Sequence, residues 1–224
     1  MNSLRLTFVA IAAAVVGTVG VYIYNQSATG STAINLGAVQ AQTVSEDIDT
    51  SDILDMILGE DTAELTVYEY ASFTCPHCAS FHKGVFGQIK EDYIETGKIK
   101  FVHREIYFDR YGLWAGMVAR CAGPDRYFGI VDIIYNEQSE WRQGEPAQIA
   151  DNLRKIGLTA GIEPTELDAC MNDADKAQAL YATFQKNSEA DGIRSTPSFV
   201  IDGQTYTNMS YSEFADILDG KLGG

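Results

Sequence analysis

Hydrophobic and polar positions follow two different periods along the chain, and each change of period marks where a strand gives way to a helix. Residues 64–71 form an apolar, β-branched and aromatic run, which predicts a buried strand. Residues 79–90 carry apolar side chains three and four positions apart, which predicts a helix with one buried face. Residues 98–107 repeat the strand pattern. This order predicts a βαβ unit with parallel strands and a right-handed crossover.

A helical period without any strand pattern fills the next part of the chain, from about residue 112 to residue 192. Prolines in first turns and glycines after last turns mark the ends of several of these helices. Helices are expected at 113–121, 125–136, 145–156, 165–171 and 176–190. We interpret this block as a helical subdomain that is inserted into the α/β unit.

The strand pattern returns after the helical block. Residues 198–201 and 204–206 flank Asp202 and Gly203, a pair that suits the two positive φ angles of a type I′ hairpin turn. Residues 211–222 then carry a helical stripe. A βαβ unit, a helical block and a ββα unit in this order predict an α/β protein with a thioredoxin-like fold and an inserted helical subdomain.

The N-terminal part of the chain has a different character from the rest. Residues 1–24 contain a long uncharged apolar run, which indicates either a signal peptide or an N-terminal membrane anchor, and its length fits both. Residues 25–44, rich in small and polar side chains, predict a flexible linker. Residues 45–58 predict a short amphipathic helix that packs on the domain, or alternatively binds a partner. We therefore expect one exported domain over 45–224, in a compartment where disulfides persist.

Length, composition and charge narrow the class of protein. The 224 residues suffice for one domain with an insertion, and 46% of them are hydrophobic. The formal net charge of −15 argues against nucleic acids and anionic membrane surfaces as partners, because both favour basic proteins. We interpret the excess of acidic residues as a contribution to solubility.

The run Cys75-Pro76-His77-Cys78 lies where the first predicted strand ends and the first predicted helix begins. Two thiols at this spacing close as a disulfide or open as a dithiol, so the motif passes two electrons. Free N–H groups at a helix N-terminus stabilise a thiolate, and we expect the pKa of Cys75 to fall to roughly 3.5–7.5. Cys75 is the expected exposed nucleophile, and Cys78, one turn into the helix, the more buried resolving thiol. A structural disulfide or half of a metal site are the alternatives.

Two further cysteines, Cys121 and Cys170, lie on predicted helices of the block. Four cysteines allow three pairings, and the proximity of Cys75 to Cys78 leaves Cys121–Cys170 as the second pair. We expect this pair to be a structural disulfide, with a second redox-active pair as the alternative.

These features together resemble one known family. Glu69, the Cys-Pro-His-Cys motif, the later Ser195-Thr196-Pro197 and the helical block are similar to the DsbA family of exported thiol oxidases, over about residues 60–222. The resemblance implies donation of the Cys75–Cys78 disulfide to unfolded, cysteine-containing exported proteins in the bacterial periplasm. It also implies reoxidation by a membrane quinone-linked partner and no bound cofactor or metal.

The resemblance also implies roles for single residues. Pro76 and His77, between the cysteines, set the reduction potential of the Cys75–Cys78 pair, and a histidine there implies a strong oxidant. We expect the His77 ring to direct a hydrogen bond or a positive charge at the sulfur. Glu69 is expected to relay a proton near Cys78, with a solvent-facing strand position as the alternative.

Thr196 and Pro197 begin the strand at 198–201. In thioredoxin-like proteins a cis proline lies against the cysteines and leaves the main chain of the preceding residue free to pair with an extended substrate. The best-known DsbA members carry valine before this proline, whereas threonine resembles isomerases. A reductase or isomerase is therefore the alternative function.

A metal-binding protein that uses Cys75, Cys78 and His82 is a more distant alternative. We expect His82 instead to be a surface or core-edge residue. The sequence leaves open whether the N-terminal segment is cleaved, which way electrons flow, and which proteins are substrates.

Overall fold

The computed structural model describes residues 48–223, and these fold around a five-stranded sheet of order β1-β3-β2-β4-β5. The predictions for residues 1–24 and 25–44 lie outside the described residues. The strands are Met56–Leu58 (β1), Leu65–Ala71 (β2), Ile99–Glu105 (β3), Ser198–Ile201 (β4) and Gln204–Thr207 (β5).

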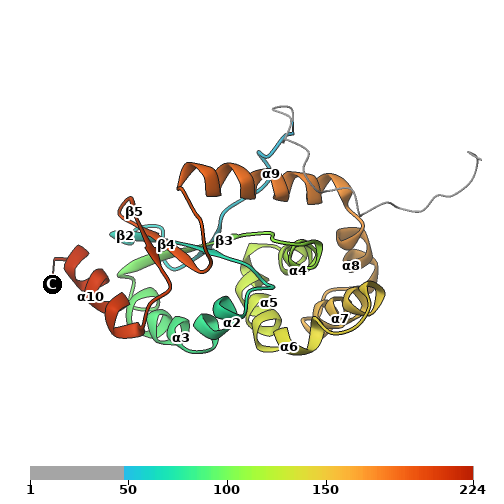
Figure 1. The fold of residues 1–224 in the computed structure, drawn as a ribbon, viewed down its shortest axis with the longest axis horizontal. Helices are drawn as coiled ribbons and strands as arrows, with labels where there is room; N and C mark the ends of the chain where they lie inside the picture. The colour runs from blue at the N-terminus through green and yellow to red at the C-terminus, as the bar shows by residue number, and fades with distance from the viewer. Residues whose placement is uncertain (1–47, 224) are drawn as a thin grey trace, which may run out of the picture. The chain divides into compact units, whose positions relative to one another are not determined.

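Strands β2 and β3 are parallel, as the βαβ pattern predicts, and β1, β4 and β5 add antiparallel strands on either side of them (Figure 1). The β4–β5 turn has φ angles of 49° at Asp202 and 72° at Gly203, which agrees with the two positive angles expected of a type I′ turn. Because β2 is central, its carboxyl end, where the cysteine motif follows, lies inside the molecule.

Helices cover both faces of the sheet (Figure 1). One face packs under the elements that carry the aromatic residues Phe81, Phe86 and Phe214, and the opposite face packs under the helix that carries Phe184. The elements on the first face are Pro76–Lys83 (α2), Val85–Ile89 (α3), the π-helix Lys90–Ile94 (η1) and Tyr211–Lys221 (α10), and that on the second is Ala174–Ala190 (α9).

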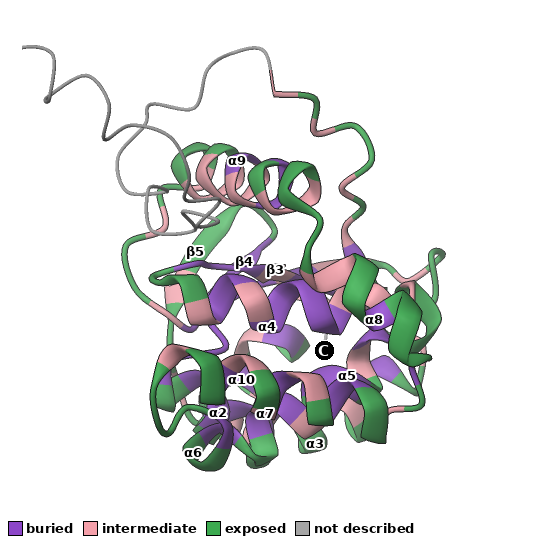
Figure 2. Ribbon diagram, turned by 90° about the vertical axis from the view of Figure 1, so that its right-hand side faces the viewer, coloured by how far each residue is buried: buried purple, intermediate pink, exposed green. Residues whose placement is uncertain are grey.

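A helical region runs from Arg110 to Ala190 and builds a core of its own. Figure 2 shows buried residues on the facing sides of its helices, and this core continues to Phe73, Cys75 and Cys78. No helix among residues 48–223 is long and apolar enough to cross a membrane. Besides α9, the helices of the region are Arg110–Cys121 (α4), Pro124–Asn136 (α5), Gln138–Trp141 (α6), Pro146–Thr159 (α7) and Pro164–Met171 (α8).

The amphipathic helix predicted at 45–58 is wrong for the residues that the structure describes. Met56–Leu58 forms an edge strand that pairs with β3, with Met56 buried and Ile57 40% exposed. Of the apolar positions that resemble a helical stripe, Ile57 and Leu58 lie in this strand, whose backbone groups pair with the outer edge of β3, whereas Ile53 and Leu54 precede it outside any strand.

The helix predicted at 79–90 is interrupted in the structure. Helix α2 ends at Lys83, and the N–H of Gly84 donates to the carbonyl of Phe81. The chain then continues through α3 and η1 to Ile94, which brings Tyr93 and Ile94 into the core against the sheet. The helix predicted at 145–156 also differs, since α7 extends to Thr159 beyond Gly157.

Candidate active site

The cysteine motif lies where β2 leaves the centre of the sheet and α2 begins. Cys75 has the extended backbone of an N-cap residue and Pro76 occupies the first turn. Proline is favoured there because it lacks an N–H that would in any case be unpaired. Both motif cysteines are free thiols, so the structure is that of the dithiol form.

Cys75 is less exposed than the sequence predicts. Only 8% of the residue is accessible and Cys78 is fully buried. The loop before β4 accounts for part of this cover, since Cys75 Sγ lies 3.5 Å from the carbonyl oxygen of Thr196. Thr196, which makes this contact, precedes Pro197, and the peptide bond between them is cis.

Hydrogen bonds lower the pKa of Cys75 to about 5. The largest cause is the hydrogen bond from the Cys78 thiol, which burial opposes. Hydrogen bonds from the side chain of Thr196 and from the main-chain N–H groups of Cys78 and His77 add to it. Each of these contacts favours the thiolate. Cys75 is therefore a thiolate at neutral pH.

Cys78 shows the opposite shift. Burial raises its pKa most, and the hydrogen bond that it gives to Cys75 and the charge of Glu69 raise it further. The main-chain N–H of Ser72 donates to its sulfur at 3.5 Å and acts against these effects. Of the two thiols, one is thus prepared for attack and the other keeps its proton.

His77 acts through its main chain rather than through its ring. The residue is exposed, and its ring makes no hydrogen bond to the described part of the chain. Its main-chain N–H, however, stabilises the Cys75 thiolate. The structure therefore shows no hydrogen bond from the ring to the sulfur, and the other expectation, a positive charge directed at the sulfur, stays a prediction.

Gln138 is a residue of the site that sequence reasoning missed. Its side-chain amide donates to the carbonyl oxygens of Phe73 at 2.7 Å and Cys75 at 2.9 Å, and it is buried. Gln138, which belongs to the helical region, therefore holds in place the turn that carries Cys75. The only signal in the sequence is a polar residue directly after the apolar stripe of a predicted helix.

Glu69 lies fully buried in β2, as the proton-relay role requires. Its carboxylate oxygens lie 2.9 and 3.2 Å from His82 Nε2 and one lies 3.8 Å from His103 Nε2. The prediction of His82 as a surface or core-edge residue is wrong, because its side chain is only 1% exposed. The spacing of four from Cys78 places both on one face of α2 and was the available signal.

A second buried acid continues the cluster on the far side of His103. The His103 Nδ1 lies 2.7 Å from the hydroxyl of Tyr127, which donates to Glu105 at 2.8 Å. Burial lowers the pKa of His103 to about 4. Burial acts to raise the pKa of Glu105, but the guanidinium of Arg120, 2.6 Å away, outweighs it and the pKa is lowered.

This site and fold have close counterparts. A family model described as Thioredoxin matches residues 51–220. The crystal structure of Wolbachia pipientis alpha-DsbA1 superposes with a TM-score of 0.68 at 28% identity, over 75% of this chain and 91% of that one. This chain is a DsbA-like member of the thioredoxin family. The oxidised form of Bacillus subtilis BdbD shares the fold, with a TM-score of 0.66 at 21% identity over 76% of this chain and 94% of that one.

Similar sequences carry related names. A Rickettsia bellii protein named "Putative protein-disulfide oxidoreductase" is 34% identical over 169 residues, or 75% of this chain. Disulfide bond formation protein D of Bacillus subtilis is 23% identical over 175 residues, which cover 75% of this chain and 77% of that protein. The match covers 64% of the Rickettsia bellii protein, so this DsbA-like chain spans less than two thirds of its length.

The buried cluster of this DsbA-like protein contains residue types that bind metals. Ligand atoms of Glu69, His82 and His103 lie within 4.8 Å of one another. However, His82 Nε2 is hydrogen-bonded to Glu69 at 2.9 Å and His103 Nδ1 to the hydroxyl of Tyr127 at 2.7 Å, so both rings already have partners within the chain. We therefore assign no metal ligands here, and His82 faces the carboxylate of Glu69.

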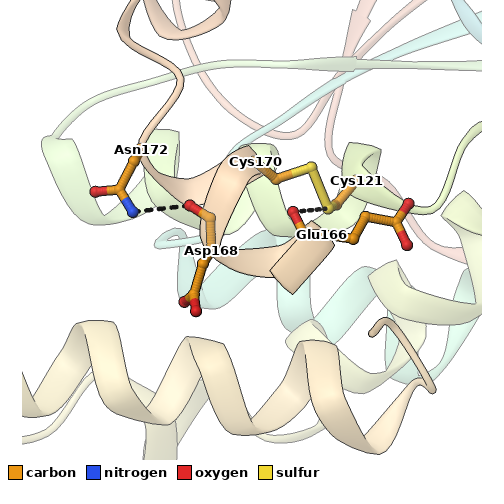
Figure 3. Close-up of a disulfide and its surroundings, with 5 residues drawn as sticks. All are labelled: Cys121, Glu166, Asp168, Cys170 and Asn172. Carbon is orange, nitrogen blue, oxygen red and sulfur yellow. Dashed lines mark hydrogen bonds between the residues drawn. A yellow bond between two sulfur atoms is a disulfide. The ribbon is translucent and has the colours of Figure 1, made fainter. Parts of the chain in front are cut away.

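The other two cysteines of this DsbA-like chain form a disulfide between α4 and α8 (Figure 3). Cys121 and Cys170 are 49 residues apart in sequence and their Cα atoms are 5.8 Å apart. Asn172, after α8, donates to the carbonyl of Asp168 and closes the end of that helix. The bond joins the first long helix of the helical region to its penultimate helix, and neither cysteine is on the motif helix.

Proposed function

We propose that this chain is a thiol:disulfide oxidoreductase of the oxidase type, which donates the Cys75–Cys78 disulfide to folding proteins. The observation that carries the proposal is the stabilised thiolate of Cys75, whose pKa is lowered to about 5. A thiolate stabilised in the dithiol form makes the disulfide the state of higher energy, so the disulfide is readily passed on.

The exchange has two balanced steps. A substrate thiolate attacks Cys75 Sγ, the Cys75–Cys78 bond breaks, and its electron pair leaves with the sulfur of Cys78, which is protonated. A second substrate thiolate then attacks the substrate sulfur of the mixed disulfide, and Cys75 leaves as a thiolate. The substrate loses two electrons, which the protein gains. The main chain of Thr196, next to Cys75, pairs with the extended substrate.

The apolar N-terminal run supports a place in the bacterial periplasm, either after removal of a signal peptide or while anchored to the inner membrane. The substrates in this proposal are unfolded exported proteins that contain cysteines. A membrane quinone-linked partner takes the electrons from the dithiol form and restores the disulfide.

Oxidative refolding tests the proposal. The oxidised protein is incubated with a reduced, unfolded disulfide-containing enzyme, and recovery of enzyme activity is followed. We expect faster recovery than with glutathione disulfide alone, and no acceleration by the Cys75→Ser variant. Equal recovery with the wild-type protein and with glutathione disulfide contradicts the oxidase assignment.

A reductase or isomerase is the second candidate, and threonine at position 196 favours it. The reduction potential of the Cys75–Cys78 pair separates the two functions. A value near that of thioredoxin, about −270 mV, identifies a reductant, whereas a value near about −120 mV identifies a strong oxidant. The measurement of the potential and the refolding assay use the same purified protein.

A further inference from the structure

The carboxylate of Glu69 is buried where its charge acts on Cys78, and it needs a compensating partner. Glu69 is fully inaccessible to solvent, and its charge raises the pKa of the Cys78 thiol. A buried carboxylate without a partner is strongly disfavoured. What neutralises Glu69 therefore also decides how easily Cys78 gains or loses its proton.

His82 is the direct partner of Glu69. Its Nε2 lies 2.9 and 3.2 Å from the two carboxylate oxygens, and the ring stacks on Tyr135 with centroids 4.3 Å apart. Its other nitrogen, Nδ1, is buried without a hydrogen-bond partner in the described part of the chain. An ionised carboxylate only accepts hydrogen bonds, so Nε2 is the donor to it, and the unpartnered Nδ1 leaves a position for one more proton.

His103 cannot take that proton. The hydroxyl hydrogen of Tyr127 is used in the bond to Glu105, so His103 must donate its Nδ1 hydrogen to the oxygen of Tyr127. Its Nε2, which faces Glu69 at 3.8 Å, is then unprotonated. Burial lowers the pKa of His103 to about 4, which keeps the ring neutral.

We propose that His82 is a positioning residue for the exchange, which holds with Glu69 the proton that Cys78 takes when the disulfide opens. In the disulfide form the His82–Glu69 pair carries one extra proton. When a substrate thiolate breaks the Cys75–Cys78 bond, that proton passes to the sulfur of Cys78 and leaves the arrangement seen in the dithiol structure. Reoxidation returns it. The inference rests on the proposed exchange at the two cysteines but not on its direction.

The groups that face this pair come from every element packed against it. Among residues 48–223 they add no salt bridge from a lysine or arginine to Glu69, and Arg120 is paired with Glu105 at 2.6 Å. The titratable and charged neighbours are Cys78 on α2, His103 and Glu105 on β3, Arg120 on α4, and Tyr127 and Tyr135 on α5.

The pH dependence of the redox equilibrium with glutathione counts the protons involved. Reduction by two glutathione molecules releases two protons, and the protein takes up one at Cys78 unless that proton comes from within. We expect the equilibrium constant to rise about 100-fold per pH unit between pH 6 and 8, since each proton released contributes about tenfold per unit. In His82→Gln we expect about tenfold per unit, because Cys78 then takes its proton from solvent.

Two outcomes overturn the assignment. A tenfold slope in the wild-type protein means that the cluster gives up no proton, and a 100-fold slope in His82→Gln means that Glu69 holds it alone. Tyr107→Phe is the matched control, since it removes another buried polar group that has no hydrogen-bond partner among residues 48–223 and should keep the wild-type slope. The value of the equilibrium constant with glutathione at one pH tests the proposed oxidase function. Only the change of that constant with pH tests the role of His82.

Histidine ¹⁵N spectra of the wild-type protein give a second readout that needs no variant. The chain has three histidines. At pH 7 we expect the ring nitrogens of His82 to change protonation between the dithiol and disulfide forms, while His103 keeps one tautomer. Identical His82 spectra in the two forms overturn the proposal even if His82→Gln does not fold.

Discussion

At the scale of single residues, the two motif thiols differ because each hydrogen bond stabilises one charge state only. The Cys78 thiol donates to Cys75 and thereby lowers the pKa of its neighbour while raising its own. Burial acts on both, but only Cys75 also receives main-chain N–H groups at the start of a helix. One contact thus produces the asymmetry that thiol–disulfide exchange requires.

Replacing Cys78 tests this asymmetry. In Cys78→Ala we expect the pKa of Cys75 to rise from about 5 toward the ordinary value of about 8.5, because the largest stabilising hydrogen bond is lost. Cys78→Ser keeps a hydroxyl donor and should show a smaller rise. The thiolate absorbance near 240 nm, followed against pH, measures both variants. An unchanged midpoint in Cys78→Ala means that the helix N-terminus alone stabilises the thiolate.

The stability of the dithiol form should rise with pH through the Cys75 thiol, whereas in the disulfide form Cys75 does not titrate. The pKa of Cys75 is about 5 when folded and about 8.5 when unfolded, so its contribution is complete above pH 8.5 and lost as the pH falls through 5. At pH 7 this contribution is about 3 kcal/mol, against about 2 kcal/mol for closing the small 75–78 loop.

We therefore expect the dithiol form to be the more stable one at pH 7 and the disulfide form below about pH 6. Urea denaturation of both forms at several pH values measures this, with Cys121–Cys170 kept oxidised throughout. A disulfide form that stays more stable at pH 7 and above contradicts the strong-oxidant assignment.

The residues that the sequence predicted best are those whose roles depend on local position. Cys75 and Pro76 occupy the first turn of α2, which the change of period at the motif already predicts. His82 and Gln138 were missed because their partners, Glu69 and the carbonyl of Phe73, come from other elements. A polar side chain does not reveal by its own position which buried group it will meet.

At the scale of elements, the ion pair between β3 and α4 should be the most sensitive link between the sheet and the helical region. Both side chains of Glu105 and Arg120 are almost fully buried. In Arg120→Ala we expect a loss of about 3–5 kcal/mol in the free energy of unfolding, because a buried carboxylate is left without its partner.

Arg154→Ala is the control for that variant, since Arg154 pairs with Asp168 at the surface and should cost less than about 1 kcal/mol. Urea denaturation compares the two variants. Similar losses for both contradict the claim that burial gives the Arg120 pair its importance.

The packing of α4 against the segment after β3 gives a second prediction at this scale. A Cβ at Gly116 meets the ring and hydroxyl of Tyr107 at 2.8–2.9 Å. Gly116→Ala should therefore destabilise the protein by about 1–3 kcal/mol. Gly129→Ala, in the interior of α5 where nothing lies within 4 Å, should stabilise it by up to about 1 kcal/mol. Thermal unfolding measures both, and stabilisation by both variants argues that Tyr107 moves freely.

Long elements with a clear period were predicted well, and short elements were not. Strands β2 and β3 follow their predicted ranges closely because β-branched and aromatic residues are frequent in both of them. Met56–Leu58 forms a strand because it pairs with the edge of β3. The local pattern of these few residues does not indicate that such an edge is available. The interruption at Gly84 likewise depends on the fit of Tyr93 and Ile94 against the sheet.

At the scale of the whole molecule, the Cys121–Cys170 disulfide closes a loop of 49 residues within the helical region. Replacing both cysteines by serine should lower the free energy of unfolding by about 4 kcal/mol in the chain-entropy model. The alkylation rate of Cys75 should not change, because the bond joins α4 to α8 and neither of its cysteines lies on α2. A slower or faster Cys75 reaction in the double variant means that the second disulfide acts on the redox site.

The helical region also limits how far this protein can be reduced to a minimal enzyme. Arg120 neutralises the charge of Glu105 in the sheet, and the side chain of Gln138 donates hydrogen bonds to two carbonyl groups of the turn that carries Cys75. Deleting residues 110–190 and rejoining the ends would leave these groups without internal partners. The block is therefore not a detachable module, and a smaller version of the protein would need a redesigned interior for β3 and a new donor for the active-site turn.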